Sequence, residues 1–261
     1  MNNFAIISAF ADNALSSLGN NAAVVYSKEE LPHEQRRSIA ADLHQPATSF
    51  ISPLKEGHFQ VYWYAPDREI GLCGHGSLAA GAFLNNFMDI QKATLHYREG
   101  HLKVGYDGES HFLCISPIEV IDHLPAPQGL EKALGVPVHD YFSTNNKDIV
   151  VLNSEADLRR MDPDFKALAQ LEPFGYAVTA LGEKCDFVSR TLVPKVQQLE
   201  DHATGSSHAA LVPFWSERLM KDKMQAFQLS PRGGAFECEM HLNQVLLKGK
   251  TKLIISGNHH F

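Results

Sequence analysis

The sequence predicts an α+β protein made of two similar lobes, each a curled sheet wrapped around one apolar helix. Two observations support this fold class. Both halves contain many short strand-like runs separated by turn residues. Each half also contains one long apolar helix that begins just after a tight glycine turn, at about residues 77–87 in the first half and after Asp201 in the second. The order of elements, not a repeated sequence, suggests that the halves are alike.

The first half predicts a lobe over residues 1–116. A helix is expected at residues 33–44, after Leu31-Pro32. Residues 13–21 form a turn-rich stretch that ends in Gly19-Asn20-Asn21. Apolar runs, the clearest of them alternating, predict strands at residues 4–10, 22–26, 49–51, 59–64, 95–97, 102–104 and 112–115.

Residues 117–127 contain three prolines and no periodicity, which predicts a linker. A second lobe is expected over residues 128–249. Its predicted helices lie around residues 155–171 and from the Asp201 turn to about Met220, where Pro213 must kink the helix or lie near its start. Its strands are expected at residues 149–152, 176–180, 187–190, 225–229, 235–240 and 244–247, with a last one at 251–255.

The composition excludes several classes of function. A chain of 261 residues with 44% hydrophobic and 20% charged residues is typical of a globular protein with a sizeable core. The net charge of −7 argues against nucleic acid as a partner. No apolar run approaches the roughly 20 residues that span a bilayer, which argues against a membrane partner. The N-terminus shows no signal peptide, so we expect a cytoplasmic protein.

The cysteines and histidines do not predict a metal centre. None of the four cysteines forms a C-x-x-C pair, and free thiols are expected. The fourteen histidines include no H-E-x-x-H or H-x-H pattern. We therefore expect no catalytic metal.

Two glycine-containing motifs carry the candidate chemistry. The first is Cys73-Gly74-His75-Gly76, and the second runs from Asp201 to His208. Each places ionisable groups on a turn that opens a helix, where backbone N–H groups and the helix dipole favour an anion. Two such turns facing one another could hold a small carboxylate between acid and base groups.

Each candidate residue also has a structural alternative. Asp201, Ser206 and Ser207 could cap a helix, or they could serve the site, with Ser206, Ser207 and the N–H groups of Gly205 and Ser206 binding a carboxylate. Cys73 could be a small buried hydrophobe, or a thiolate base stabilised by the helix N-terminus. His75, between two glycines, is expected near solvent or a cleft, and imidazole suits proton transfer because it titrates near neutrality.

Taken together, these motifs resemble those of the phenazine biosynthesis PhzF-like isomerases, a family of the diaminopimelate epimerase-like superfamily. The Cys73 block also resembles the first catalytic motif of proline racemases and diaminopimelate epimerases. The matching blocks are residues 19–25, 64–70, 73–76, 148–151, 201–208, 213–215 and 228–234.

This resemblance implies two lobes, each a β-barrel around a central helix, with an active-site cleft between them. It implies a cofactor-free and metal-free homodimer that moves or inverts a proton on small amino or hydroxy acids. It also implies that residues 250–261 return to the first lobe. Substrate-binding positions are then Asn20, Gly74, Gly76, Gly205, Ser206 and Ser207.

The chain departs from the family pattern at two positions. PhzF-like enzymes usually carry a general-base glutamate in a Ser-Glu-Thr-x-Phe segment, and Ala47 occupies that position in Pro46-Ala47-Thr48-Ser49-Phe50. The family usually has proline after the aspartate of the second motif, where this chain has His202. If Thr204-Gly205 is matched to the second racemase motif, His202 falls at the position of the second racemase cysteine.

The leading hypothesis is a cofactor-independent isomerase or epimerase that moves a proton on a small carboxylate. Asp201 and His75 are the expected proton carriers, with Cys73 or His202 as partners. Ala47 motivates an alternative, a protein of the same fold that binds a small acid without turning it over. A lyase or dehydratase, which needs one base and a leaving group, is a third hypothesis.

Overall fold

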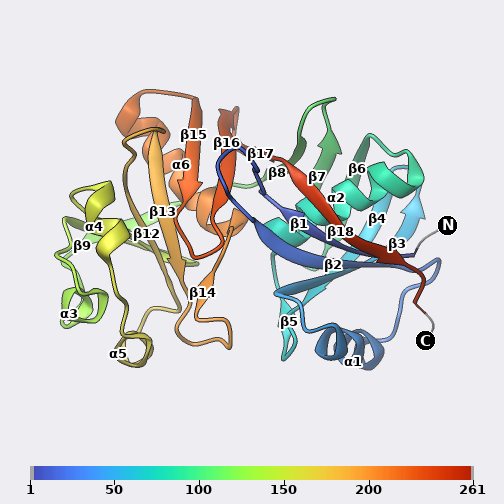
Figure 1. The fold of residues 1–261 in the computed structure, drawn as a ribbon, viewed down its shortest axis with the longest axis horizontal. Coiled ribbons are helices and arrows are strands. Elements are labelled where there is room, and N and C mark those ends of the chain that lie inside the picture. Colours follow the sequence, from blue (N-terminus) through green and yellow to red (C-terminus); the bar gives the residue numbers. More distant parts are fainter. Residues whose placement is uncertain (1–2, 260–261) are drawn as a thin grey trace. The chain divides into compact units, whose positions relative to one another are not determined.

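The computed structural model describes residues 3–259 and divides the chain into two units (Figure 1). Unit 1 combines Met1–Ile115 with Leu246–Phe261, and unit 2 is Ser116–Val245. The C-terminal segment thus belongs to unit 1 from Leu246 onward, and residues 260 and 261 of the predicted segment lie outside the described residues. Strands dominate both units, and this confirms the mixed α+β class.

Unit 1 is one curled sheet in which β18, β1, β2, β3, β4, β6, β7 and β8 follow one another by pairing, and β5 pairs with β4. The β2–β3 and β4–β6 pairs are parallel and the others antiparallel. The strands are β1 (Phe4–Ala9), β2 (Asn20–Tyr26), β3 (Ala47–Lys55), β4 (His58–Tyr64), β5 (Glu69–Ile70), β6 (Lys92–Tyr97), β7 (Gly100–Tyr106), β8 (His111–Ile115) and β18 (Thr251–Gly257). The strand β17 (Gln244–Gly249) contains the boundary between unit 2 and the C-terminal part of unit 1.

Helix α2 (Gly74–Met88) lies inside this sheet and contacts β1, β2, β3, β6, β7 and β8. Its residues from Gly74 to Leu84 are all buried, and from Leu78 onward small and apolar side chains cover every side of the helix. Helix α1 (His33–Leu43) instead packs from outside on β3 and β4 and buries Ile39 and Ala40. Enclosure of α2 leaves its polar N-terminal turn as the place where chemistry can occur.

Unit 2 repeats this plan with a sheet in which β9, β10, β11, β12, β13, β15 and β16 follow one another by pairing, and β14 pairs with β13. The strands are β9 (Val120–Leu124), β10 (Asp140–Thr144), β11 (Asp148–Val151), β12 (Tyr176–Leu181), β13 (Phe187–Leu192), β14 (Glu200–Asp201), β15 (Lys223–Gln228) and β16 (Gly234–His241). The enclosed helix is α6 (Gly205–Leu219), which contacts β12, β15 and β16.

Pro213 lies inside α6 without ending it. A proline there removes the hydrogen bond to the carbonyl four residues earlier, which is that of Ala209. The N–H of Ile118 donates to this Ala209 carbonyl at 3.0 Å and replaces the lost bond. The indole N–H of Trp215 donates to Thr179 at 2.9 Å and ties the next turn of α6 to the sheet.

The single helix predicted at residues 155–171 is wrong. The structure has two short helices, α4 (Glu155–Arg160) and α5 (Phe165–Ala169). Pro163 disfavours helical backbone in the residue before it. The Asp164 carboxylate then caps α5 by accepting from the N–H groups of Lys166 and Ala167.

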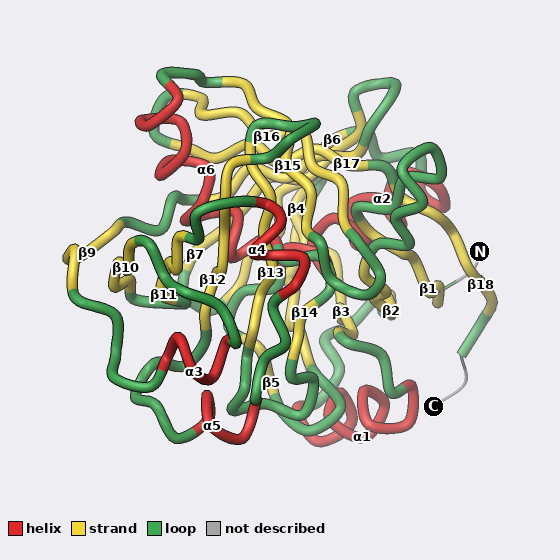
Figure 2. The backbone as a smooth tube through the Cα atoms, turned by 60° about the vertical axis from the view of Figure 1, so that its left-hand side comes forward, coloured by secondary structure: helices red, strands yellow, loops and turns green. Residues whose placement is uncertain are grey.

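The linker predicted at residues 117–127 is also wrong in its centre, where β9 pairs with β10 at the side of unit 2 (Figure 2). All five residues of β9 are exposed, so no alternation marks the strand in the sequence. The helix α3 (Leu130–Leu134) follows it and packs against α5.

Two buried histidines make the fold sensitive to acid. Burial lowers the pKa of His208 in α6 and of His111 in β8 to about 4. Each has an Nε2 atom without a hydrogen-bond partner in the part of the chain that the structure describes. His208 is stacked on Phe236 at 3.7 Å between ring centroids, so it is held as a neutral core residue.

The free energy of unfolding should therefore fall as the pH drops from about 6.5 to about 4, because in that range the unfolded chain binds protons that the folded chain does not. Each histidine should remove about 2 kcal/mol between pH 7 and pH 5. Urea unfolding at pH 7 and pH 5 measures this loss. Between these pH values, the free energy of unfolding should fall by about 2 kcal/mol less in His208→Gln than in the wild type. The matched exposed variant His241→Gln should keep the wild-type slope, and an unchanged slope in His208→Gln would contradict the assignment.

Candidate functional site

The first predicted motif forms the N-terminal turn of α2. Cys73 is the N-cap residue in extended backbone, and its Sγ accepts the Gly76 N–H at 3.4 Å. The Ser77 hydroxyl donates to the Cys73 carbonyl at 2.6 Å and closes the turn. A sulfur in this position lies at the positive end of the helix dipole, which favours its thiolate form.

His75 lies against this sulfur. Its Nδ1 and Nε2 atoms are 3.6 and 3.8 Å from Cys73 Sγ, close enough for the two groups to share a proton. The Asn20 amide donates to His75 Nδ1 at 3.3 Å. These three residues are called the thiol–imidazole cluster below. His75 is only 5% exposed, so of the two expected locations, solvent or a cleft, the open surface does not apply.

Asn20 reaches His75 because of the glycine before it. Gly19 has φ +66°, a left-handed backbone that side chains rarely tolerate, and a Cβ there would lie 2.3 Å from the Ala9 carbonyl oxygen. The chain therefore turns tightly into β2 and presents Asn20, which is fully buried, to α2. Asn20, predicted from the sequence as a substrate-binding residue, lies beside His75.

Ala47 lies on the same side of the sheet as this cluster. It begins β3 and, by strand alternation, shares a face with Ser49, whose hydroxyl donates to the Gly76 carbonyl at 2.9 Å. Its neighbour in the parallel pair with β2 is Ala22, two residues after Asn20. Ala47 is small, apolar and fully buried.

The second predicted motif forms a turn held by polar side chains from β15 and the loop after it. Gln228, 1% exposed, accepts the Thr204 N–H at 2.8 Å and donates to the carbonyl of Asp201. The Ser230 hydroxyl donates to the His202 carbonyl at 2.7 Å. Asp201 pairs with Thr191 as the end of β14. Gln228 and Ser230 were not predicted as positioning residues, although both belong to a block that the sequence singles out.

The N-terminus of α6 differs from that of α2 because its N-cap residue, Thr204, makes no side-chain cap. Among the described residues no acceptor takes the N–H groups of Gly205, Ser206 and Ser207. The Thr191 hydroxyl donates to Ser207 at 2.9 Å and anchors that side chain. Three backbone donors thus point out of the positive end of α6, an arrangement that suits an anion.

His202 lies in this turn with an unusual imidazole. Burial lowers its pKa, so the ring is neutral at physiological pH. Its Nδ1 is buried and has no hydrogen-bond partner within residues 3–259. A neutral imidazole with an unused nitrogen is able to accept a proton.

Lys147 is a residue of this region that the sequence analysis did not single out. Its ammonium, on the turn between β10 and β11, lies 2.9 Å from Ser206 Oγ. A lysine in a turn gives no signal of burial in the sequence, yet this one is only 7% exposed.

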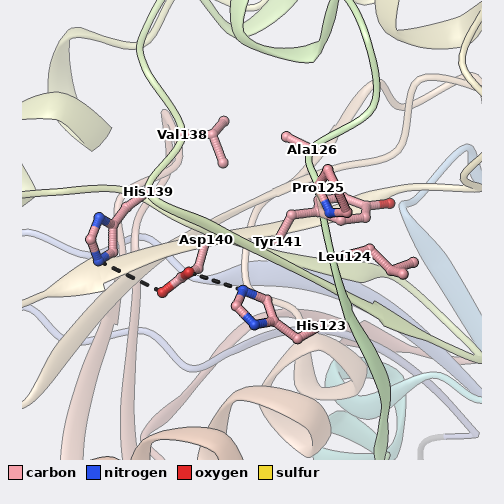
Figure 3. A pocket seen from close by; sticks show the side chains of 8 residues that line it. All are labelled: His123, Leu124, Pro125, Ala126, Val138, His139, Asp140 and Tyr141. Carbon is pink, nitrogen blue, oxygen red and sulfur yellow. Dashed lines mark hydrogen bonds and ion pairs between the residues drawn. The ribbon is translucent and has the colours of Figure 1, made fainter.

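Two surface hollows of unit 2 are separate from these residues. One has a volume of about 370 Å³, and Asp140 lines it between His123 and His139 (Figure 3). The Nε2 atoms of His123 and His139 lie 3.0 and 3.7 Å from carboxylate oxygens of Asp140. Another, of about 1000 Å³, lies between α6 and the start of β9. None of the predicted site residues lines either hollow.

Within residues 3–259, no three His, Cys, Asp or Glu side chains are grouped so that they could hold a metal ion. The same residues include no helix that is both long and apolar enough to cross a membrane. All four cysteines are free thiols.

Two units that each enclose a helix, with ionisable groups at both helix N-termini, define the diaminopimelate epimerase-like fold. A probable proline racemase from Agrobacterium radiobacter shares this fold, with a TM-score of 0.68 over 98% of this chain and 92% of that one at 10% identity. The chain belongs to the PhzC-PhzF family of phenazine biosynthesis-like proteins, whose profile matches residues 7–258.

Relatives cover nearly the whole length of the chain. Two proteins of Pseudomonas aeruginosa, both named as uncharacterized isomerases, are 34% and 36% identical over 97% and 96% of this chain and 97% and 95% of their own. A PhzF-family crystal structure from Enterococcus faecalis superposes with a TM-score of 0.90 at 34% identity and covers 97% of both chains. The resemblance inferred from the motifs is thereby confirmed.

The glycine at position 76 is expected to be irreplaceable, because a Cβ there would lie 2.9 Å from Ser49 Oγ and from Trp63, and 3.0 Å from Cys73 Sγ. Gly76→Ala should lower the free energy of unfolding by about 1–3 kcal/mol through this overpacking. Urea unfolding tests this, with Gly257→Ala as the control because open space surrounds Gly257. Equal stability of Gly76→Ala and the wild type would contradict the packing described here.

Proposed function

We propose that the protein is a cofactor-independent isomerase that moves a proton on a small carboxylate substrate. The observation that carries this proposal is the thiol–imidazole cluster at the N-terminus of α2, in which Cys73 and His75 lie within 3.6 Å. Relatives that match nearly the full chain are named isomerases, and this supports the same reaction class.

The chemistry requires a base and a set of donors. A proton on a carbon next to an activating group is weakly acidic, so its removal needs a base close by and hydrogen-bond donors where negative charge develops. The thiol–imidazole cluster offers two groups that exchange protons near neutrality. The N–H groups of Gly205, Ser206 and Ser207 offer the donors, with the dipole of a 15-residue helix behind them.

In this proposal His75 and Asp201 carry the protons. Cys73 assists His75 through their shared contact, and His202 assists Asp201 as a neutral imidazole. Asn20 orients the His75 ring by its hydrogen bond to Nδ1. Gly74 and Gly76 leave room for a substrate at the end of α2, while Gly205, Ser206 and Ser207 bind its carboxylate.

A second candidate function follows from Ala47. Loss of a positioned general base costs about 10²–10⁴ in rate, which is enough to end an activity. The alternative is a protein that binds a small acid through the same residues without turnover. Asp12, one acid on the same unit, is already engaged with Lys250 at 3.3 Å and with the Ala14 N–H at 2.8 Å. The homodimer, the cytoplasmic location and the lyase alternative stay predictions.

Replacement of either proton carrier should stop proton exchange. The wild type, incubated in heavy water with a panel of amino, hydroxy and aromatic acids, should introduce deuterium into one of them. His75→Asn and Asp201→Asn should each slow this by about 10²–10⁴-fold. Mass spectrometry of the acids gives the rate, with His241→Asn and Asp67→Asn as surface controls. Unchanged exchange in both site variants would remove these residues from the mechanism.

Substitution at position 47 separates the two candidate functions. If the protein is an isomerase, the wild type exchanges deuterium and Ala47→Glu is not needed for activity. If it only binds acids, a small acid raises the melting temperature of the wild type without exchange, and exchange begins only in Ala47→Glu. The matched variant Ala47→Gln has the same size without a base, so it distinguishes basicity from a change of packing. We expect exchange in the wild type.

A further inference from the structure

Trp63 carries a buried hydrogen-bond donor that no acceptor uses. The residue lies in β4 and is only 1% exposed, and its indole Nε1 atom has no hydrogen-bond partner within residues 3–259. An indole N–H only donates, and a buried donor without an acceptor costs free energy, so such donors are rare in native proteins. The other tryptophan follows the usual rule, because the Trp215 N–H donates to Thr179 at 2.9 Å.

The sheet turns the Trp63 side chain toward α2. Trp63 is the partner of Ser49 in the antiparallel pair of β3 and β4, so the two side chains share a face of the sheet. The Ser49 hydroxyl donates to the carbonyl of Gly76 at 2.9 Å, which identifies this face as the one next to the first turn of α2. The Tyr97 ring packs against the indole at 5.4 Å between ring centroids and helps to hold it there.

Gly76 leaves a small space that both the indole and the sulfur of Cys73 border. A Cβ at Gly76 would lie 2.9 Å from Trp63 Cδ1 and 3.0 Å from Cys73 Sγ. Cδ1 is bonded to Nε1, so the unused donor is the next ring atom after the one that borders this space. The indole donor and the thiol–imidazole cluster are therefore neighbours inside unit 1.

The charge of the sulfur decides how well it accepts a hydrogen bond. A neutral thiol is a weak acceptor, whereas hydrogen bonds to an anion are about twice as strong as neutral ones. When the thiol proton passes to His75, whose ring nitrogens lie 3.6 and 3.8 Å from the sulfur, the S–H bond breaks, an N–H bond forms on the imidazole and the sulfur becomes an anion. The Gly76 N–H, 3.4 Å from the sulfur, is one donor to this anion.

We propose that Trp63 is a positioning residue that stabilises the thiolate form of Cys73 by donating its indole N–H to the sulfur. The donor gains its acceptor when the thiol loses its proton, so the indole favours the form of the thiol–imidazole cluster that takes a proton from substrate. This inference rests on the proposed function, because that function gives the thiolate its role.

The first experiment observes the donor directly in the full chain. With isotope-labelled tryptophan, NMR shows one indole N–H signal from each of the two tryptophans, and Trp215→Phe assigns them. The difference in ultraviolet absorbance between the wild type and Cys73→Ala gives the thiolate fraction between about pH 5 and about pH 9. Wherever the thiolate is present, the Trp63 signal should lie downfield of its position in Cys73→Ala. The Trp215 signal should be the same in both proteins.

Substitution of Trp63 measures the size of the effect. Trp63→Phe keeps an aromatic ring against Tyr97 but has no N–H. It should lower the ratio of thiolate to thiol at Cys73 by about 10-fold at a given pH, the effect of losing one hydrogen bond to a charged group. Trp215→Phe is the matched control and should leave this ratio unchanged. Urea unfolding checks that both variants are folded.

Ser49 is the competing acceptor for the indole N–H. Its Oγ borders the same space, at 2.9 Å from a Cβ placed at Gly76, and it is neutral. Ser49→Ala removes this oxygen. In that variant the Trp63 signal should still follow the Cys73 thiolate, because the anion is the stronger acceptor.

The outcomes separate this inference from the proposed function. It is overturned if the Trp63 signal does not respond to the thiolate, if its response disappears in Ser49→Ala, if Trp63→Phe keeps the wild-type thiolate ratio, or if no thiolate forms. Deuterium exchange by the wild type tests the proposed function separately. Exchange without a response of Trp63 leaves the function standing and overturns the inference, whereas a response without exchange supports the hydrogen bond and overturns the function.

Discussion

Enclosure of one helix by a curled sheet is the constraint on which both units depend. A helix that is buried on every side is covered mainly by small and apolar residues, as in α2 from Leu78 to Leu84. Its peptide groups satisfy one another except at the ends. In the first turn of each enclosed helix, backbone donors, a dipole and ionisable side chains therefore occur together. The position of the candidate chemistry follows from the fold itself.

The two helices differ in how they are capped, and this gives the two units different chemistry. Cys73 caps α2 with its own side chain, which uses the Gly76 N–H and brings the sulfur against His75. Thr204 does not cap α6, so the N–H groups at its start remain available. The capped terminus therefore presents a thiol and an imidazole, whereas the uncapped terminus presents backbone hydrogen-bond donors.

Local patterns predicted the parts of the fold that are decided locally. Alternation identified β4, and the glycine turns identified the starts of α2 and α6. The predictions failed where contacts between distant parts of the chain determine the local structure. The exposed strand β9 exists because β10 pairs with it, and Pro213 is tolerated because Ile118 satisfies the Ala209 carbonyl.

The same division applies to the candidate site. Residues inside the motifs, such as His75 and Ser206, were predicted as candidate site residues because the glycine turn and the start of the helix are adjacent in the sequence. Lys147 and Gln228 were not, because they reach the start of α6 from the β10–β11 turn and from β15, 59 and 24 residues away from their partners Ser206 and Thr204. Burial of a cation and of an amide at those distances is a property of the folded sheet. A motif supplies the reactive groups of a site. The orientation of these groups and the charge around them depend on side chains that only folding brings there.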